Sequence, residues 1–231
     1  MQKLLAVVFE GVVTATAGAL LGFGAGLVVA GPAGAVAGAA VAGLNGLAGG
    51  ARGIYDWRRP RGWLAFLTDS TWGLVTTALG LVLAGANLLL PIARCESELT
   101  RRRNRFVFDG GLALQRGMAL TLGNVISNGN PSGRGFNPEF LSRHEELHVW
   151  QARLFGPLFP LVYAVWFAAG VVVGTAVWLF HRRESWTALV RTAAYFDNPF
   201  EYWAYRNDGN WPPAGAHPLL AWSAAADGAD I

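Results

Sequence analysis

A long stretch without basic residues limits what this chain can fold into. Residues 11–50 contain no lysine or arginine and consist mainly of alanine, glycine, valine and leucine, whereas arginines cluster at 52–61 and 101–105. Only 14% of all residues are charged and 53% are hydrophobic, while a soluble domain averages about 25% charge. This separation of charge from apolar sequence is typical of a chain surrounded by a lipid bilayer. We therefore predict an integral membrane protein.

The basic-free stretch divides into two segments, 11–30 and 33–50. Each approaches the roughly 20 residues that a helix needs to cross the hydrocarbon core. Gly31-Pro32 lies between them and favours a break, so we predict a glycine-rich transmembrane helical hairpin over residues 1–50. Small residues at four-residue spacing let helices approach closely in lipid. They are Gly18, Gly22, Gly26, Gly34 and Gly38.

This glycine spacing resembles that of the glycine-zipper membrane domains of bacteria. The resemblance implies close helix pairing. The pairing can be internal to the hairpin, or it can join the chain to another membrane protein or to a second copy as a homo-oligomer. The predicted location is the bacterial inner membrane, with the lipid bilayer as the general partner.

Residues 51–104 form a basic connector and a third apolar segment. By the tendency of basic loops to remain in the cytoplasm, the connector at 51–62 is predicted to be cytoplasmic. If residues 72–92 cross the membrane once, the two arginine-rich loops lie on opposite faces, against that tendency. Alternatively, residues 63–92 enter the bilayer and return. The formal net charge of only +3 and the position of the basic clusters beside apolar runs predict contact with lipid head groups and no nucleic-acid partner.

The pattern changes after residue 104. Short alternating apolar runs up to Ser127, separated by glycine-containing turns, predict a small antiparallel β-meander. Loop is expected over 124–137, a helix from about residue 138 to Phe155, a fourth apolar segment over 156–180, and further helix over 184–206. Residues 105–206 would form one unit, and residues 207–231 a flexible tail. The predicted fold is thus a mainly α membrane protein with a β-meander beside a helix.

That helix carries the pattern His-Glu-x-x-His. Residues four apart share one helix face, so His144 and His148 can direct both imidazoles at one ion. Glu145 lies beside that face, where its carboxylate can take a proton from a water molecule without binding the metal. The alternative is a surface helix with two ordinary histidines. Two of the chain's four histidines lie in this pattern, which favours a catalytic zinc site.

Glu201 is the candidate third ligand. A zinc ion held by two histidines needs one more protein ligand while one position stays open for water. Glu201 follows Asn198-Pro199, where a helix can begin, and aromatic residues surround it. A buried carboxylate requires a compensating partner, which a metal ion would supply. Cys95 is the only cysteine, which excludes a cysteine-rich zinc site and an internal disulfide.

At these residues the chain resembles a known family. His144 and His148 followed by a distant glutamate resemble the gluzincin class of zinc metallopeptidases, and the continuation to Gln151 resembles the HExxHxxQ variant of bacterial membrane peptidases. The resemblance covers about residues 120–206. It implies that His144, His148 and Glu201 bind zinc and that Glu145 is the general base.

The chain departs from the CAAX-protease and heat-shock types of membrane gluzincin at one position. Those proteins carry an acidic residue four positions after the ligand glutamate, where this chain has Tyr205. Tyr202, Tyr205 and His181 are therefore candidates for contacts to the transition state. Gln151 is a candidate for a hydrogen bond to a ligand histidine.

A geometric condition follows from this ligand set. If Glu201 joins the two histidines, both ends of the fourth apolar segment must reach one site, whereas a simple crossing would separate them. We predict that this segment is re-entrant, with Gly170 or Gly174 at the bend. The other possibility is a zinc site within the membrane thickness.

The predicted function is hydrolysis of peptide bonds near the membrane surface by a membrane-embedded zinc metallopeptidase acting on a peptide or protein substrate. The alternative is a membrane scaffold or assembly subunit with a structural or vestigial zinc site. A structural zinc ion would have a fourth protein ligand, and His181 is the candidate for that place. A glycine-zipper channel without metal chemistry is a further possibility.

Overall fold

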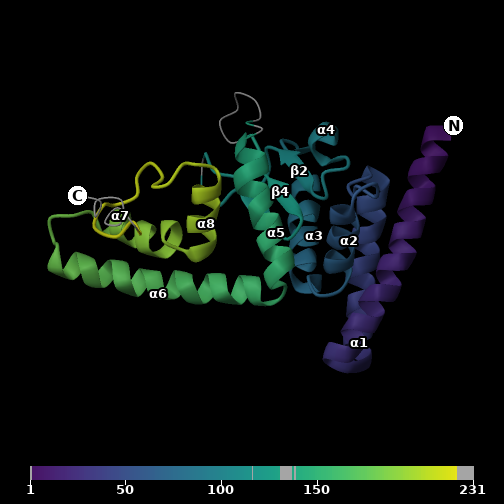
Figure 1. The fold of residues 1–231 in the computed structure, drawn as a ribbon, viewed down its shortest axis with the longest axis horizontal. Coiled ribbons are helices and arrows are strands. Elements are labelled where there is room, and N and C mark those ends of the chain that lie inside the picture. Colours follow the sequence, from purple (N-terminus) through teal and green to yellow (C-terminus); the bar gives the residue numbers. More distant parts are fainter. Residues whose placement is uncertain (1, 116, 131–136, 138, 223–231) are drawn as a thin grey trace. The chain divides into compact units, whose positions relative to one another are not determined.

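The structure is a computed structural model and describes residues 2–115, 117–130, 137 and 139–222 (Figure 1). It is mostly helical with one small mixed sheet, so the predicted mainly α fold is confirmed. In chain order the elements are α1 (Gln2–Arg52), α2 (Pro60–Ser70), α3 (Leu74–Leu88), β1 (Arg94–Cys95), α4 (Ser97–Thr100), β2 (Phe106–Asp109), β3 (Leu120–Leu122), β4 (Val125–Ser127), η1 (Phe140–Glu145), α5 (Glu146–Phe155), α6 (Leu158–Phe180), α7 (Trp186–Arg191), η2 (Thr192–Phe196) and α8 (Pro199–Asn207). Both α1 and α6 are long and apolar enough to cross a membrane.

The chain divides into two compact units. The first contains residues 1–141 and 145–159, and the second contains 142–144 and 160–231. The boundary between the two units therefore falls inside the predicted segment 105–206. The sheet and α5 fold with the N-terminal helices, because β4 packs against α3 and the Asn124 side chain donates a 2.9 Å hydrogen bond to Asn45 of α1.

Within the first unit, α1 is a hairpin whose arms meet through backbone. It is broken at Ala30 and Gly31, and Gly31 has a φ of +64°, in the left-handed region that favours glycine. The two arms run antiparallel, since a Cβ atom added to Gly22 would collide with the carbonyl oxygen of Gly38. Thr14 Oγ1 donates a 2.6 Å hydrogen bond to the carbonyl oxygen of Gly46 across the same interface. The absence of side chains at these glycines therefore permits the close approach of the arms.

The two arginine-rich loops lie side by side in the first unit. The backbone N–H of Arg102 donates to the carbonyl of Gly53 at 2.8 Å, and that of Asn104 donates to Ile54 at 2.7 Å. Between these loops, α2 and α3 form a pair bent by 90°, and α3 has only 15 residues. Residues 72–92 therefore do not form one straight helix of crossing length. The adjacent loops agree instead with the alternative in which this segment enters and returns.

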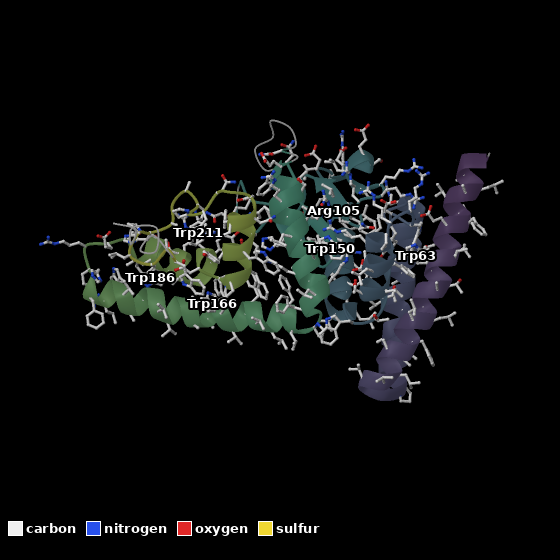
Figure 2. All side chains as sticks on the ribbon, viewed as in Figure 1. Trp63, Arg105, Trp150, Trp166, Trp186 and Trp211 are labelled. Carbon is white, nitrogen blue, oxygen red and sulfur yellow. The ribbon has the colours of Figure 1, made fainter. Side chains whose placement is uncertain are left out.

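A buried ion pair joins α2 to α5 in this unit. Arg153 donates to both carboxylate oxygens of Asp69 at 2.8 Å, and each side chain is only 3% exposed. Burial alone would lower the pKa of Arg153, but the charge and hydrogen bonds of Asp69 raise it above its usual value. Trp150, labelled in Figure 2, stacks against the same guanidinium at 4.8 Å and against Arg61 at 4.4 Å. These contacts hold α5 against α2.

The sheet differs from the predicted antiparallel meander. Its order is β1-β2-β4-β3; β3 and β4 are antiparallel, but β2 and β4 are parallel. The prediction failed because residues 112–114 form no strand: the N–H of Leu112 donates to the Asn87 side chain at 2.9 Å, which takes the chain away from the sheet edge. Val125–Ser127, predicted as loop, supplies the inner strand instead.

The second unit is built along α6. This helix is continuous, so the predicted re-entrant bend at Gly170 or Gly174 is wrong. The two glycines instead admit the returning chain, since a Cβ atom on Gly174 would lie 2.6 Å from the Cα atom of Val190. Trp166 donates to the carbonyl of Ala193 at 3.2 Å, which holds η2 on α6 (Figure 2). Because α7, η2 and α8 run back along α6, its two ends need not meet.

Residues 208–222 also pack in the second unit, although the sequence predicts a flexible tail from residue 207. The rings of Trp222 and Trp166 lie edge to face at 5.3 Å, and the N–H of Trp222 donates to Asp197 at 3.1 Å. The remainder of the predicted tail, residues 223–231, lies outside the described residues. Aromatic contacts and a hydrogen bond therefore hold a segment that looks irregular in sequence.

Candidate metal centre

The His-Glu-x-x-His pattern spans the junction of two helical forms. Asn137 begins the helix by accepting hydrogen bonds from the N–H groups of Glu139 and Phe140 at 3.0 and 3.2 Å. The first part, η1, is a π-helix that ends within the pattern, and α5 continues without a gap to Phe155. π-Helical turns are rare and occur frequently at functional sites. The predicted helix over the pattern is thus present, with a wider turn at His144.

His144 is held by the second unit. Its Nδ1 atom lies 2.9 Å from Oδ2 of Asp208, and its Nε2 atom lies 3.7 Å from Oε2 of Glu201. An ionised carboxylate can only accept, so in neutral His144 the Nδ1–H group donates to Asp208 and Nε2 carries the lone pair. The ring of Tyr205 meets His144 edge to face at 4.6 Å. The lone pair of His144 is thereby directed toward the carboxylate of Glu201.

One face of α8 supplies these contacts. Glu201, Tyr205 and Asp208 are spaced i, i+4 and i+7, which places them on the same side of a helix. Asn198 caps the helix by accepting from the N–H of Phe200 at 3.0 Å, and Pro199 occupies its first turn. The cap sets where α8 begins and therefore which residues face His144.

His148 follows His144 by one turn of the same helix. Its Nδ1 atom lies 2.8 Å from Oε1 of Gln151. An amide oxygen only accepts, so Nδ1–H donates to Gln151 and the lone pair on Nε2 is left for a metal. One potential ligand atom from each of His144, His148 and Glu201 lies within 4.8 Å of the other two, and all three residues are buried. This buried group could hold a metal ion.

The donor set fits zinc. Two imidazole nitrogens and one carboxylate are among its usual ligands, at about 2.0–2.2 Å in tetrahedral geometry. Such geometry separates two ligand atoms by about 3.3–3.5 Å, close to the 3.7 Å between His144 and Glu201. Hydrogen bonds at both Nδ1 atoms are also typical of histidines that bind metal through Nε2. The donor types and the spacing of His144 and Glu201 are therefore compatible with a zinc ion.

Glu145 and Glu146 have separate surroundings. Glu145 is 5% exposed, and the hydroxyl of Thr121 in β3 donates to its Oε2 atom at 2.5 Å. Glu146 instead binds Arg105 and also lies 3.3 Å from Arg61. Burial lowers the pKa of Arg105, and its contact with Glu146 partly opposes that effect. Of the two glutamates, Glu146 is thus occupied by ion pairs, while Glu145 is oriented by one neutral donor.

The remaining predicted residues lie elsewhere. His181 is exposed and its Nδ1 lies 3.1 Å from the carbonyl of Val177. It is 18 residues from Tyr163, or about 27 Å along α6, and the Tyr163 hydroxyl donates to Glu201 at 3.0 Å. His181 therefore lies at the far end of α6 from the residue that contacts Glu201. Tyr202 packs edge to face on Trp211 at 4.7 Å (Figure 2).

Three supporting residues were not predicted: Asp208, Thr121 and Tyr163. For Asp208 a signal existed, because it follows Glu201 at helical i+7 spacing. Thr121 and Tyr163 belong to a strand and to an apolar helix remote in sequence, so no local pattern relates them to the site. Comparisons of this chain with protein families, curated proteins and solved structures find no match.

Proposed function

We propose that this protein is a membrane-embedded zinc metallopeptidase that hydrolyses peptide bonds near the membrane surface. One observation carries the proposal: His144 and His148 each have Nδ1 in a hydrogen bond, and the metal-binding atoms of both lie with Glu201 in one buried group. Such hydrogen bonds fix the tautomer and the ring orientation of a metal-binding histidine. The gluzincin-like sequence pattern supports the same assignment.

Each residue has a role in this reaction. His144, His148 and Glu201 would hold the ion, which when bound supplies Lewis-acid chemistry that polarises a carbonyl group and acidifies water. Glu145 would accept a proton from the attacking water and later deliver it to the leaving amine. Thr121 orients the carboxylate of Glu145, and Asp208 orients the His144 ring.

The proposal is tested with the purified full chain in detergent. The metal content is measured by mass spectrometry, and cleavage is measured with a quenched-fluorescent peptide library. We expect one zinc ion per chain, lost in His148→Ala and retained in Glu145→Gln, and no turnover in either variant. His217→Ala is the control, because His217 contacts Glu184 at 3.0 Å and is not in the metal-binding group. Turnover by Glu145→Gln would refute the hydrolase assignment.

One observation favours a second function. The metal-binding group and Glu145 are all at most 7% exposed, which suits a closed structural site in a membrane scaffold. In that case Glu145→Gln and the native chain would bind zinc equally, neither would cleave peptides, and loss of the metal would lower the unfolding temperature. The same samples therefore separate the two functions.

A further inference from the structure

Two adjoining surface hollows in the first unit lie at the end of the hairpin that carries the arginine-rich loops. One, of about 550 Å³, is lined by Trp57, Arg58, Arg59, Pro60, Trp63, Leu64 and Leu67. The other, of about 420 Å³, is lined by Ala6, Phe9, Glu10, Val13, Thr14, Ala17, Trp57, Trp63 and Phe66. Trp57 and Trp63 border both hollows and thus form the wall between them.

This wall is built by direct contacts. The two indole rings meet edge to face at 4.9 Å, and Trp63 Nε1 donates to the carbonyl oxygen of Trp57 at 2.9 Å. Trp57 Nε1 in turn donates to Glu10 at 2.9 Å. Trp63 is 54% exposed (Figure 2). A large exposed indole beside a candidate membrane span is typical of the boundary between lipid tails and head groups.

The first arm of α1 packs alongside α2. Glu10 of α1 lies against Trp57, while eight residues further along α1 a Cβ atom on Gly18 would lie 3.6 Å from Oγ of Ser70, at the end of α2. Helix α2 and the first arm of α1 therefore run in the same direction, away from the arginine-rich loop. Eight residues of helix span about 12 Å, which is the depth of apolar wall available to an acyl chain.

The charge at the upper end is positive. Arg58 makes no ion pair with a residue that the structure describes, and Arg59 has a single carboxylate neighbour, Asp56, at 3.5 Å. The negative charge of Glu10 is compensated by Arg102, which donates to its two carboxylate oxygens at 2.8 and 3.1 Å, so Glu10 does not repel a nearby anion. Guanidinium groups bind phosphate oxygens strongly and with two donors at once.

We propose that these hollows form a binding site for an anionic glycerophospholipid. Its phosphate contacts Arg58 and Arg59, and its two acyl chains lie on either side of the Trp57–Trp63 wall, one in each hollow. A soluble phosphate compound matches only the arginines, whereas a two-chain lipid also covers the apolar linings. The site serves to hold the hairpin at a set depth in an anionic membrane, and it does not depend on the metal centre.

The full chain is placed in bicelles of phosphatidylcholine and phosphatidylglycerol and released from them in the mass spectrometer. Native mass spectrometry then measures which lipids remain bound to it. We expect one phosphatidylglycerol per chain, in preference to phosphatidylcholine. Each arginine near an anionic lipid contributes about fivefold to affinity, so Arg58→Gln/Arg59→Gln is expected to lower retention about 10- to 30-fold. Arg182→Gln/Arg183→Gln, a pair of exposed arginines after α6, is the matched control and is expected to behave as the native chain.

Three further measurements make the result decisive. Trp63→Ala is expected to lose the lipid while Trp63→Phe retains it, and thermal unfolding in phosphatidylcholine bicelles checks that all variants fold. Millimolar inorganic phosphate is expected to leave the bound lipid in place. Equal retention of both lipids, native-like retention by the double arginine variant, or displacement by inorganic phosphate would each overturn the proposal.

Discussion

The carboxylate of Asp208, the C-cap residue of α8, lies 2.9 Å from Nδ1 of His144 and two helical turns after Glu201. This contact supplies an acidic partner for a candidate ligand histidine, whose ring also meets Tyr205 edge to face. It makes the orientation of His144 a property of α8 as well as of its own helix.

Asp208 is therefore expected to control metal affinity. Loss of a residue that orients a ligand histidine lowers metal affinity about 10- to 100-fold. Asp208→Ala should show this loss in zinc titrations with a competing chelator, and Asp208→Asn, which keeps an acceptor, should show a smaller one. Asp109→Asn in β2 is the control. Unchanged affinity in Asp208→Ala would mean that the contact does not orient the ring.

Thr121 is expected to affect turnover without affecting the metal. Its hydroxyl donates to Glu145 at 2.5 Å, and positioned proton transfer contributes about 10²–10⁴-fold to rate. Thr121→Val should lower kcat about tenfold or more at unchanged zinc content, whereas Thr121→Ser should remain close to the native chain. A parallel loss of zinc in Thr121→Val would indicate a structural effect instead.

The hairpin offers a matched pair of glycines. A Cβ atom on Gly22 would collide with the carbonyl of Gly38, while one on Gly24 would meet nothing within 4 Å. Gly22→Ala should therefore destabilise the chain by about 1–3 kcal/mol, the usual cost of overpacking. Gly24→Ala should have little effect. Thermal unfolding in detergent compares them, and equal midpoints would contradict the close approach of the arms.

The Arg153–Asp69 pair predicts a non-additive effect on stability. Arg153→Met leaves a buried carboxylate without its cation and should lower the free energy of unfolding by about 3–5 kcal/mol. Asp69→Asn in the same chain removes the stranded charge and should recover much of that loss. Denaturant unfolding of the single and double variants in detergent measures the difference. A double variant no more stable than Arg153→Met would exclude this explanation.

Asp197 predicts a pH dependence of stability. Burial raises the pKa of its carboxyl from 3.8 to about 6, opposed in part by the hydrogen bond from the N–H of Trp222. Between those values the folded chain binds more protons than the unfolded chain, so this contribution to stability is complete below pH 3.8 and is lost as the pH rises through 6.

Asp197→Asn keeps a neutral side chain at all pH values and should remove that dependence. The difference in unfolding temperature between the variant and the native chain is the measured quantity, since other groups titrate equally in both. We expect the unfolding temperature of the variant to rise relative to that of the native chain as the pH rises from 4 to 7. A difference that does not vary with pH would contradict the raised pKa.

The sequence by itself determined the local features. Residues 11–50 lack basic residues and have a Gly-Pro break, which is sufficient for an apolar helix that reverses at Gly31. Helical spacing brought His144 and His148 to one turn, and Asn198-Pro199 marked the start of the helix that carries Glu201. Each of these features depends on residues within a few positions of one another, so periodicity and capping rules apply.

Only the tertiary structure decided how distant segments combine. The run at 112–114 has the composition of a strand but is held by Asn87, and α6 is one continuous helix against which the chain returns through α7 and η2. Likewise, only folding brings Asp208 to His144 and Thr121 to Glu145. The physical reason is that packing and hydrogen bonding between segments compete with local preferences, and which partner wins depends on contacts that the order of residues does not display.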